Sequence, residues 1–206
     1  MNRYWGFLIL VSGALLWQSC RKEPLNHLSN DESRIYITQF DSTVSFNSYK
    51  TFSVSDSVLL LVNGQDVGMV LDSADSLFIQ TFKTAMQQVG YTLVARTDSP
   101  NLAVNLTHLN SNYVAVTYFN DYGNYWNPYY WGYGGYSYGF PYYYSAYQVN
   151  EDALAFDMFD LKNATANGKQ LKDIWSALIK GEDIFNPANV SAEVGILFSQ
   201  SPYLKQ

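Results

Sequence analysis

Alternating or continuous apolar stretches recur along the chain, and this pattern predicts β-strands. The predicted strands cover residues 35–40, 49–54, 58–62, 67–71, 91–95, 102–109, 113–119, 153–161 and 171–179. Two other stretches repeat their apolar residues at spacings of three and four, which predicts amphipathic helices over residues 72–89 and 187–198. The chain therefore combines many short strands with two helices.

Capping residues mark the ends of the predicted helices. Asp72 or Ser73 can cap the first helix, and Asp75 places a negative charge in its first turn. Gly90 suits the left-handed position that ends such a helix. In the second helix we expect Pro187 in the first turn, where a missing N–H costs nothing.

The connections between the predicted strands indicate how the strands pair. Most are short, which favours antiparallel neighbours, and the dipeptide Asn63-Gly64 is typical of a tight hairpin. The length suits a single domain, which we expect over residues 35–206. The predicted fold class is α+β, with a mainly antiparallel β-sheet packed by two amphipathic helices and a Tyr/Gly-rich insertion between strands at about residues 119–148.

The beginning of the chain has the composition of an export signal. Residues 4–17 form an apolar run, which is shorter than the roughly 20 residues that a membrane-spanning helix needs. The run leads to Cys20, the only cysteine, and residues 16–20 resemble the lipobox of bacterial lipoproteins. That resemblance implies a signal peptide at residues 1–19, a diacylglyceryl group on Cys20, and a lipidated N-terminus and tether over residues 20–34.

Charge narrows the class of partners. The chain carries 12 Lys and Arg against 18 Asp and Glu, a formal charge of −6, so it lacks the basic surface that nucleic-acid binding needs. We expect no nucleic-acid partner and a membrane attachment through lipidated Cys20 in the cell envelope, at the outer membrane. Arg21, Lys22 and Glu23 form no clear acidic sorting run, which leaves the periplasmic face and the cell surface as alternatives.

An aromatic segment lies between the strands predicted over residues 113–119 and 153–161. Residues 118–147 contain 12 Tyr, 2 Trp, 2 Phe, five Gly and two Pro, with Asp121 as the only charged residue. Tyrosine rings stack on sugars and peptides at low entropic cost, whereas glycine and proline prevent a regular period. An insertion partly folded over the sheet, a binding surface and a piece of core all stay open. The candidate ligand contacts are Tyr125, Trp126, Tyr129, Tyr130, Trp131 and Tyr133.

One catalytic motif occurs inside this segment. Residues 135–139 match G-x-S-x-G around Ser137, the nucleophile motif of α/β-hydrolases. Those enzymes take their histidine base from later in the chain, but the only histidines, His27 and His108, precede Ser137. We expect no catalytic residue, and we keep an envelope hydrolase acting on glycans as the alternative.

The carboxylates and the metal-ligating residue types also give no indication of a catalytic or metal site. Asp157 and Asp160 are three apart on a predicted strand, which puts them on opposite faces and not side by side as in a glycosidase. We expect both to face solvent or to bond within a turn. Two histidines and one cysteine give few metal ligands, so we expect no metal and no cofactor.

The order of several short motifs resembles one bacterial family. A lipobox is followed by YKTF, a helix ending in VGY, SPNLAV, a Tyr/Gly-rich stretch, FDMFDL, IWSALI and a final amphipathic helix. This order is similar to that of the Bacteroidetes-type envelope lipoproteins known as domain of unknown function 4136, from residue 35 to about residue 204. In that family the tryptophan strand commonly continues Trp-Arg-Gly, whereas Trp175 is followed here by Ser176 and Ala177.

The resemblance implies an envelope address and a fold type, without a mechanism. Together with the residues above, it leads us to expect a lipid-anchored cell-envelope protein with a non-catalytic binding or structural accessory role. We expect its aromatic segment to contact an envelope polysaccharide or a protein partner.

Overall fold

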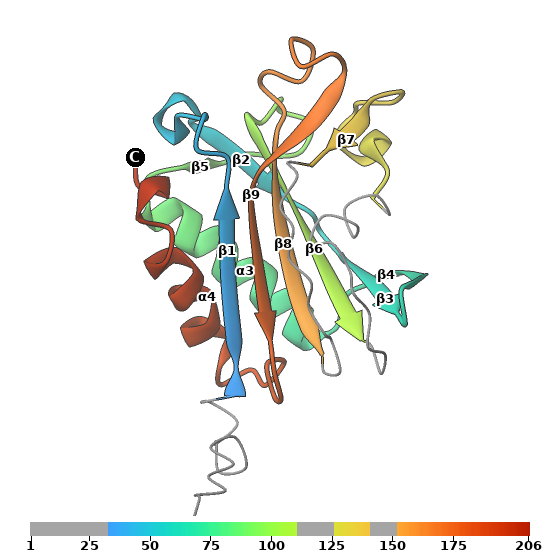
Figure 1. The fold of residues 1–206 in the computed structure, drawn as a ribbon, viewed down its shortest axis with the longest axis vertical. Coiled ribbons are helices and arrows are strands. Elements are labelled where there is room, and N and C mark those ends of the chain that lie inside the picture. The colour runs from blue at the N-terminus through green and yellow to red at the C-terminus, as the bar shows by residue number, and fades with distance from the viewer. Residues whose placement is uncertain (1–32, 111–125, 141–151) are drawn as a thin grey trace, which may run out of the picture. The chain divides into compact units, whose positions relative to one another are not determined.

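The computed structural model describes residues 33–110, 126–140 and 152–206. Residues 33–206 form one compact unit (Figure 1). The predicted signal peptide, the lipidation site Cys20, most of the tether, the strand predicted over residues 113–119 and the candidate contact Tyr125 lie outside the described residues.

Nine strands of the described residues form one sheet (Figure 1). They are β1 (Ile35–Phe40), β2 (Thr51–Val54), β3 (Val58–Val62), β4 (Gln65–Val70), β5 (Thr92–Leu93), β6 (Leu102–Asn110), β7 (Ser137–Gly139), β8 (Ala153–Asp160) and β9 (Gln170–Lys180). The α-helices are α3 (Ser73–Gln88) and α4 (Val190–Ser199), and the 3-10 helices are η1 (Phe46–Ser48), η3 (Pro128–Trp131) and η4 (Pro202–Leu204). The main strand order is β1-β9-β8-β6-β2-β5, with β3 also on β6, β4 on β3 and β7 on β9.

The sheet is mixed, so the prediction of a mainly antiparallel sheet is matched only in part. The long pairings of β1 with β9, β9 with β8 and β8 with β6 are antiparallel. However, β6 runs parallel to β2 and β3, β2 runs parallel to β5, and β7 runs parallel to β9. Helix α3 lies between β4 and β5 in the chain and provides the crossover that a parallel return to β6 requires. The fold is α+β.

Both α-helices cover one face of the sheet, and the main core lies beneath them (Figure 1). Phe78 and Phe82 of α3 and Phe156 of β8 are fully buried, and the rings of Phe82 and Phe156 stack at 5.1 Å. Trp175 of β9 packs in the same core and its Nε1 donates to Ser201 Oγ at 2.9 Å. The predicted apolar stripe of the first helix is therefore the stripe that contacts the sheet.

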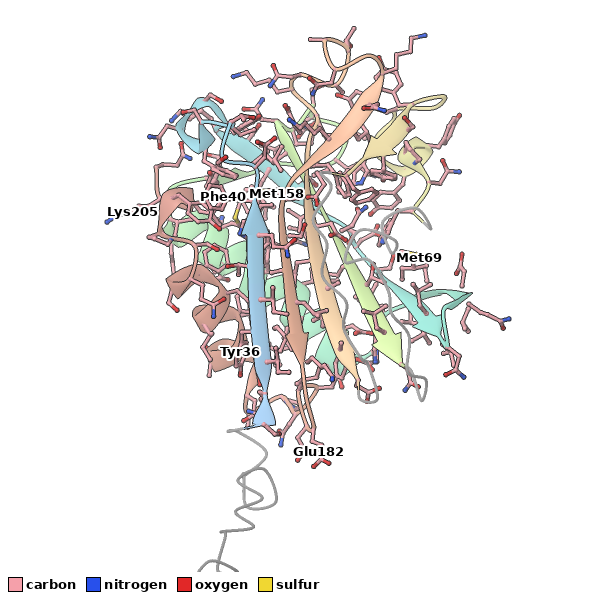
Figure 2. The ribbon with its side chains drawn as sticks, viewed as in Figure 1. Tyr36, Phe40, Met69, Met158, Glu182 and Lys205 are labelled. Atoms are coloured by element: carbon pink, nitrogen blue, oxygen red, sulfur yellow. The ribbon has the colours of Figure 1, made fainter. Side chains whose placement is uncertain are left out.

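The local signals for the first helix and the hairpin are confirmed. Asp72 Oδ1 accepts from Asp75 N at 2.8 Å and Asp75 Oδ2 accepts from Asp72 N at 3.3 Å, which is a capping box. Asn63 and Gly64 have φ values of 52° and 73°, as a tight hairpin between β3 and β4 requires. Met69 of β4 is 47% exposed at the outer edge of the sheet (Figure 2).

The last helix starts later than predicted. Pro187 was expected in its first turn, but α4 begins at Val190, after Asn189. Asn186 Oδ1 accepts from Ala188 N at 3.1 Å, and this local bond holds the backbone around Pro187 in a turn that competes with the helix. Among the described residues, no helix has the length and apolarity needed to cross a membrane.

The face of the sheet opposite the helices is also covered. Residues 126–140, which we call the aromatic cover, pack there through Trp126, Trp131 and several tyrosines. Trp126 lies in a cluster with residues of β3, β6, β8 and β9, while Trp131 lies in a second cluster with Phe159 and Leu171. The protein therefore has three layers, with the two α-helices, the sheet and the aromatic cover in that order.

Candidate functional site

Two tryptophans anchor the aromatic cover on the sheet. Trp126 and Trp131 are each only 4% exposed. Trp126 Nε1 donates to Thr107 Oγ1 at 3.2 Å, and Trp131 Nε1 donates to Asn105 Oδ1 at 2.9 Å. Asn105 and Thr107 are fully buried on β6, so the indole N–H groups supply partners that these polar side chains need. Both tryptophan side chains are therefore almost completely buried, although Trp131 also contributes to the pocket lining.

Helix η3 places Tyr129 on the outside of the cover. Asn127 Oδ1 accepts from Tyr129 N at 2.9 Å and caps the helix, with Pro128 in the first turn. Gly132 ends it with a φ of 83°. Tyr129 is 74% exposed, yet its ring lies against Gly134, where a β-carbon would stand only 2.7 Å from Tyr129 Cδ2. The absence of a side chain at Gly134 thus lets the backbone support an exposed ring.

A pocket of about 460 Å³ lies between the aromatic cover and the turn that follows β5. Its volume is within the range of small-molecule sites. The lining includes Arg96, Ser99, Tyr129, Tyr130, Trp131 and Tyr133. Arg96 is the only charged side chain among the described residues that line it.

Arg96 and Tyr130 join the two walls of the pocket. Arg96 Nη1 donates to Tyr130 O at 2.7 Å, and the guanidinium carbon lies 4.5 Å from the centre of the Tyr130 ring. The Tyr130 hydroxyl donates to Asp56 Oδ1 at 2.7 Å and accepts from Asp56 N at 3.0 Å. Burial, together with the Asp56 carboxylate, raises the pKa of Tyr130 to about 12, so the hydroxyl keeps its proton at neutral pH.

Tyr133 ties the far side of the pocket to the end of β8. Its hydroxyl donates to Leu161 O at 3.1 Å, and its ring meets that of Tyr136 edge-on at 5.2 Å. Burial, then the neighbouring Tyr136 and Asp160, raise the pKa of Tyr133. Tyr133 is therefore a neutral hydrogen-bonding group that fixes the wall in place.

A pair of buried carboxyl groups lies on the sheet face beneath the cover. Asp157 and Asp173 are 2% and 1% exposed. Ser176, opposite Asp157 in the register of β8 and β9, donates its hydroxyl to Asp173 Oδ2. Asp157 Oδ2 has no hydrogen-bond partner among the described residues. Burial and then Asp173 raise the pKa of Asp157 well above its ordinary value, and burial raises the pKa of Asp173 to about 7.

Asp157 and Asp160 lie on opposite faces as predicted, but the expectation of exposed side chains is wrong. Asp160 is 3% exposed, accepts from the Tyr49 hydroxyl at 3.0 Å and accepts from Asn163 N at 2.9 Å. The second bond is the turn bond that was expected as an alternative. Within residues 33–110, 126–140 and 152–206, no group of three or more His, Cys, Asp or Glu could hold a metal ion.

The hydrolase motif does not have the geometry of a nucleophile elbow. Ser137 lies in β7, a three-residue strand that pairs in parallel with β9 and continues to Gly139, whereas the motif requires a sharp turn into a helix. His108 is on β6, and its ring lies 4.0 Å from that of Phe185, which packs against the core under the helices. The sheet therefore separates His108 from Ser137.

The structure brings together most of the predicted ligand contacts. Tyr129, Tyr130, Trp131 and Tyr133 all line the pocket, whereas Trp126 is buried in the neighbouring cluster. Arg96 also lines the pocket but was not among the predicted ligand contacts, because it belongs to no sequence motif. The sequence feature that could have drawn attention to Arg96 is a positive charge directly after a predicted strand in a chain that is acidic overall.

Comparisons with known proteins show the family of this chain and a protein with a similar fold. No curated protein matches the sequence. The crystal structure of a DUF4136 family protein from Bacteroides thetaiotaomicron has a TM-score of 0.69 and 23% identity, covering 86% of this chain and 99% of that one. The PelC dodecamer from Paraburkholderia phytofirmans has a TM-score of 0.39 and 11% identity, with coverages of 84% and 97%. The model of the family described as a domain of unknown function (DUF4136) matches residues 37–203. The chain therefore belongs to the DUF4136 family.

Proposed function

We propose that this chain is a lipid-anchored protein of the cell envelope with a non-catalytic binding role. Its anchor is Cys20, supported by the resemblance of residues 16–20 to a lipobox, and its location is the outer membrane. Its binding site is the pocket between the aromatic cover and the turn after β5, and its ligand is an envelope glycan.

The observation that carries this proposal is the exposed but supported ring of Tyr129. An aromatic ring that is already held in position can pack against the C–H face of a sugar at little entropic cost. Thr97 and Ser99 bring hydroxyl groups to the same lining, and these can exchange hydrogen bonds with sugar hydroxyls. The pocket thus combines an apolar platform with neutral polar groups.

The size of the site favours a glycan over a protein partner. A stable protein interface buries roughly 800 Å² on each side, usually around several aromatic anchors. In this region only Tyr129 is a largely exposed aromatic side chain among the described residues, and it borders a pocket of about 460 Å³. A sugar ring matches a single platform beside a pocket of this volume.

The test is equilibrium binding of isolated envelope polysaccharide and peptidoglycan to the full chain in a neutral detergent. Tyr129→Ala is expected to weaken binding about tenfold, which corresponds to about 1.4 kcal/mol of lost stacking. Tyr129→Phe keeps the ring and is expected to bind within about twofold of wild type. Binding that is absent in wild type, or that survives Tyr129→Ala unchanged, would show that this pocket is not the glycan site.

A further inference from the structure

The guanidinium of Arg96 is held in position, and it has no anionic partner within the described part of the chain. Its Nη1 donates to Tyr130 O and its guanidinium carbon lies over the Tyr130 ring, so two contacts fix the side chain although it is exposed. No carboxylate among the described residues lies within ion-pair distance of it. Of the acidic side chains next to Tyr130 and in the same turn, Asp56 accepts from the Tyr130 hydroxyl and Asp98 accepts from Thr97 Oγ1.

An arginine has five N–H donors in a planar fork, and only one of these is used by Tyr130. The remaining donors are available to a ligand in the pocket that Arg96 lines. A planar fork matches the two oxygens of a carboxylate, and such charge-assisted bonds are about twice as strong as neutral ones. The single charge in the lining also matches a monoanion better than a doubly charged phosphate.

Resting on the proposed glycan function, we infer that the pocket is specific for sugars that carry a carboxylate, the uronic-acid class. Arg96 binds the carboxylate and Tyr129 supports the ring of the sugar. The overall charge of −6 does not exclude this, because charges beyond roughly 8 Å are largely screened at physiological ionic strength and the nearby Asp56 carboxylate already accepts from the Tyr130 hydroxyl. Within the lining itself the only charge of the described residues is positive.

The test compares acids with their own methyl esters. Galacturonate and mannuronate trimers, and the methyl ester of each, are titrated into the full chain in a neutral detergent. At least one acid is expected to bind, and its ester, which has the same ring and no charge, is expected to bind roughly 10- to 100-fold more weakly. This comparison needs no variant, so it is independent of any effect of mutation on folding.

Two charge-matched variants then locate the carboxylate. Arg96→Gln is expected to lose the preference for acid over ester, while Lys205→Gln, which removes the same charge at a position away from β7 and the aromatic cover (Figure 2), is expected to keep it. Arg96→Lys keeps the charge without the fork and is expected to fall between the two.

Three results would overturn the inference. Equal binding of acid and ester would leave the glycan function standing without acid specificity. An acid preference that survives Arg96→Gln would place the carboxylate elsewhere. Failure of every trimer to bind would exclude uronic acids, and the binding of isolated envelope polysaccharide would then decide separately whether the proposed glycan function also fails.

Discussion

Replacing Trp131 by alanine is expected to lower the free energy of unfolding by roughly 3–5 kcal/mol, the cost typical of truncating a large buried aromatic side chain. Trp131 is 4% exposed and lies in the cluster of Ala103 and Phe159. Its removal also takes away the hydrogen bond to Asn105 Oδ1 and leaves that buried atom without its donor. Urea denaturation of the variant and wild type measures the difference.

Tyr129→Ala is the matched control for this experiment. It truncates an aromatic residue of the same short helix, but one that is 74% exposed, so the expected change is below about 0.5 kcal/mol. A Trp131→Ala variant as stable as this control would mean that Trp131 does not contribute to the stability of the core. It would contradict the burial of Trp131 against the sheet.

Asp157→Asn is expected to stabilise the protein at pH 8 and to change little at pH 4. The pKa values of Asp157 and Asp173 lie above the ordinary 3.8 in the folded state, so the folded protein keeps protons that the unfolded chain releases. For these two groups the free energy of unfolding therefore falls as the pH rises above about 4, and for Asp173 the fall continues through about 7. The amide has no proton to lose, which removes part of this fall.

The gain is expected at pH 8 because burial and the neighbouring Asp173 raise the pKa of Asp157, which makes ionisation costly in the folded state. Thermal or urea unfolding of both proteins between pH 4 and pH 8 gives the difference directly, and other titrating groups cancel in it. Asp98→Asn makes the same replacement in an exposed turn and is the control for the loss of a carboxyl group. A variant less stable than wild type at pH 8 would contradict the account of this carboxyl pair.

Ser176, the residue after Trp175, is the polar neighbour of this carboxyl pair. The family resemblance implies an arginine at that position, but this chain has Ser176, which lies opposite Asp157 and donates to Asp173. A hydroxyl can satisfy one carboxylate oxygen, but it cannot neutralise a charge. Ser176 therefore supplies a hydrogen bond but no positive charge to the pair, and burial raises the pKa of both Asp157 and Asp173.

Local features could be predicted from the sequence, because neighbouring residues determine them. The capping box at Asp72 and the hairpin turn at Asn63-Gly64 depend on a few adjacent side chains, and both formed as expected. Strand β1 also begins and ends as predicted, at Ile35 and Phe40. The prediction that the last helix includes Pro187 was wrong, because the side chain of Asn186 accepts a hydrogen bond from the Ala188 backbone and stabilises a turn there.

Features that depend on distant contacts could not be predicted in this way. The parallel pairing of β2 and β3 with β6 depends on where α3 returns the chain, which no local pattern records. The aromatic cover has no period, and the burial of Trp131 depends on Asn105 about 26 positions earlier. The pocket depends on the same long-range packing, so its tyrosines were noticed while Arg96 was not.

Hydrogen exchange of the full chain, with and without isolated envelope polysaccharide, tests the central claim that a seated aromatic cover forms a glycan-binding pocket. Slow exchange around Trp126 and Trp131 is predicted in both samples, because these residues are anchored on the sheet. Additional protection at residues 96–100 and 129–134 is predicted only with polysaccharide. Fast exchange throughout residues 126–140 in both samples would contradict the packing of the aromatic cover on the sheet, and it would also contradict glycan binding at the pocket.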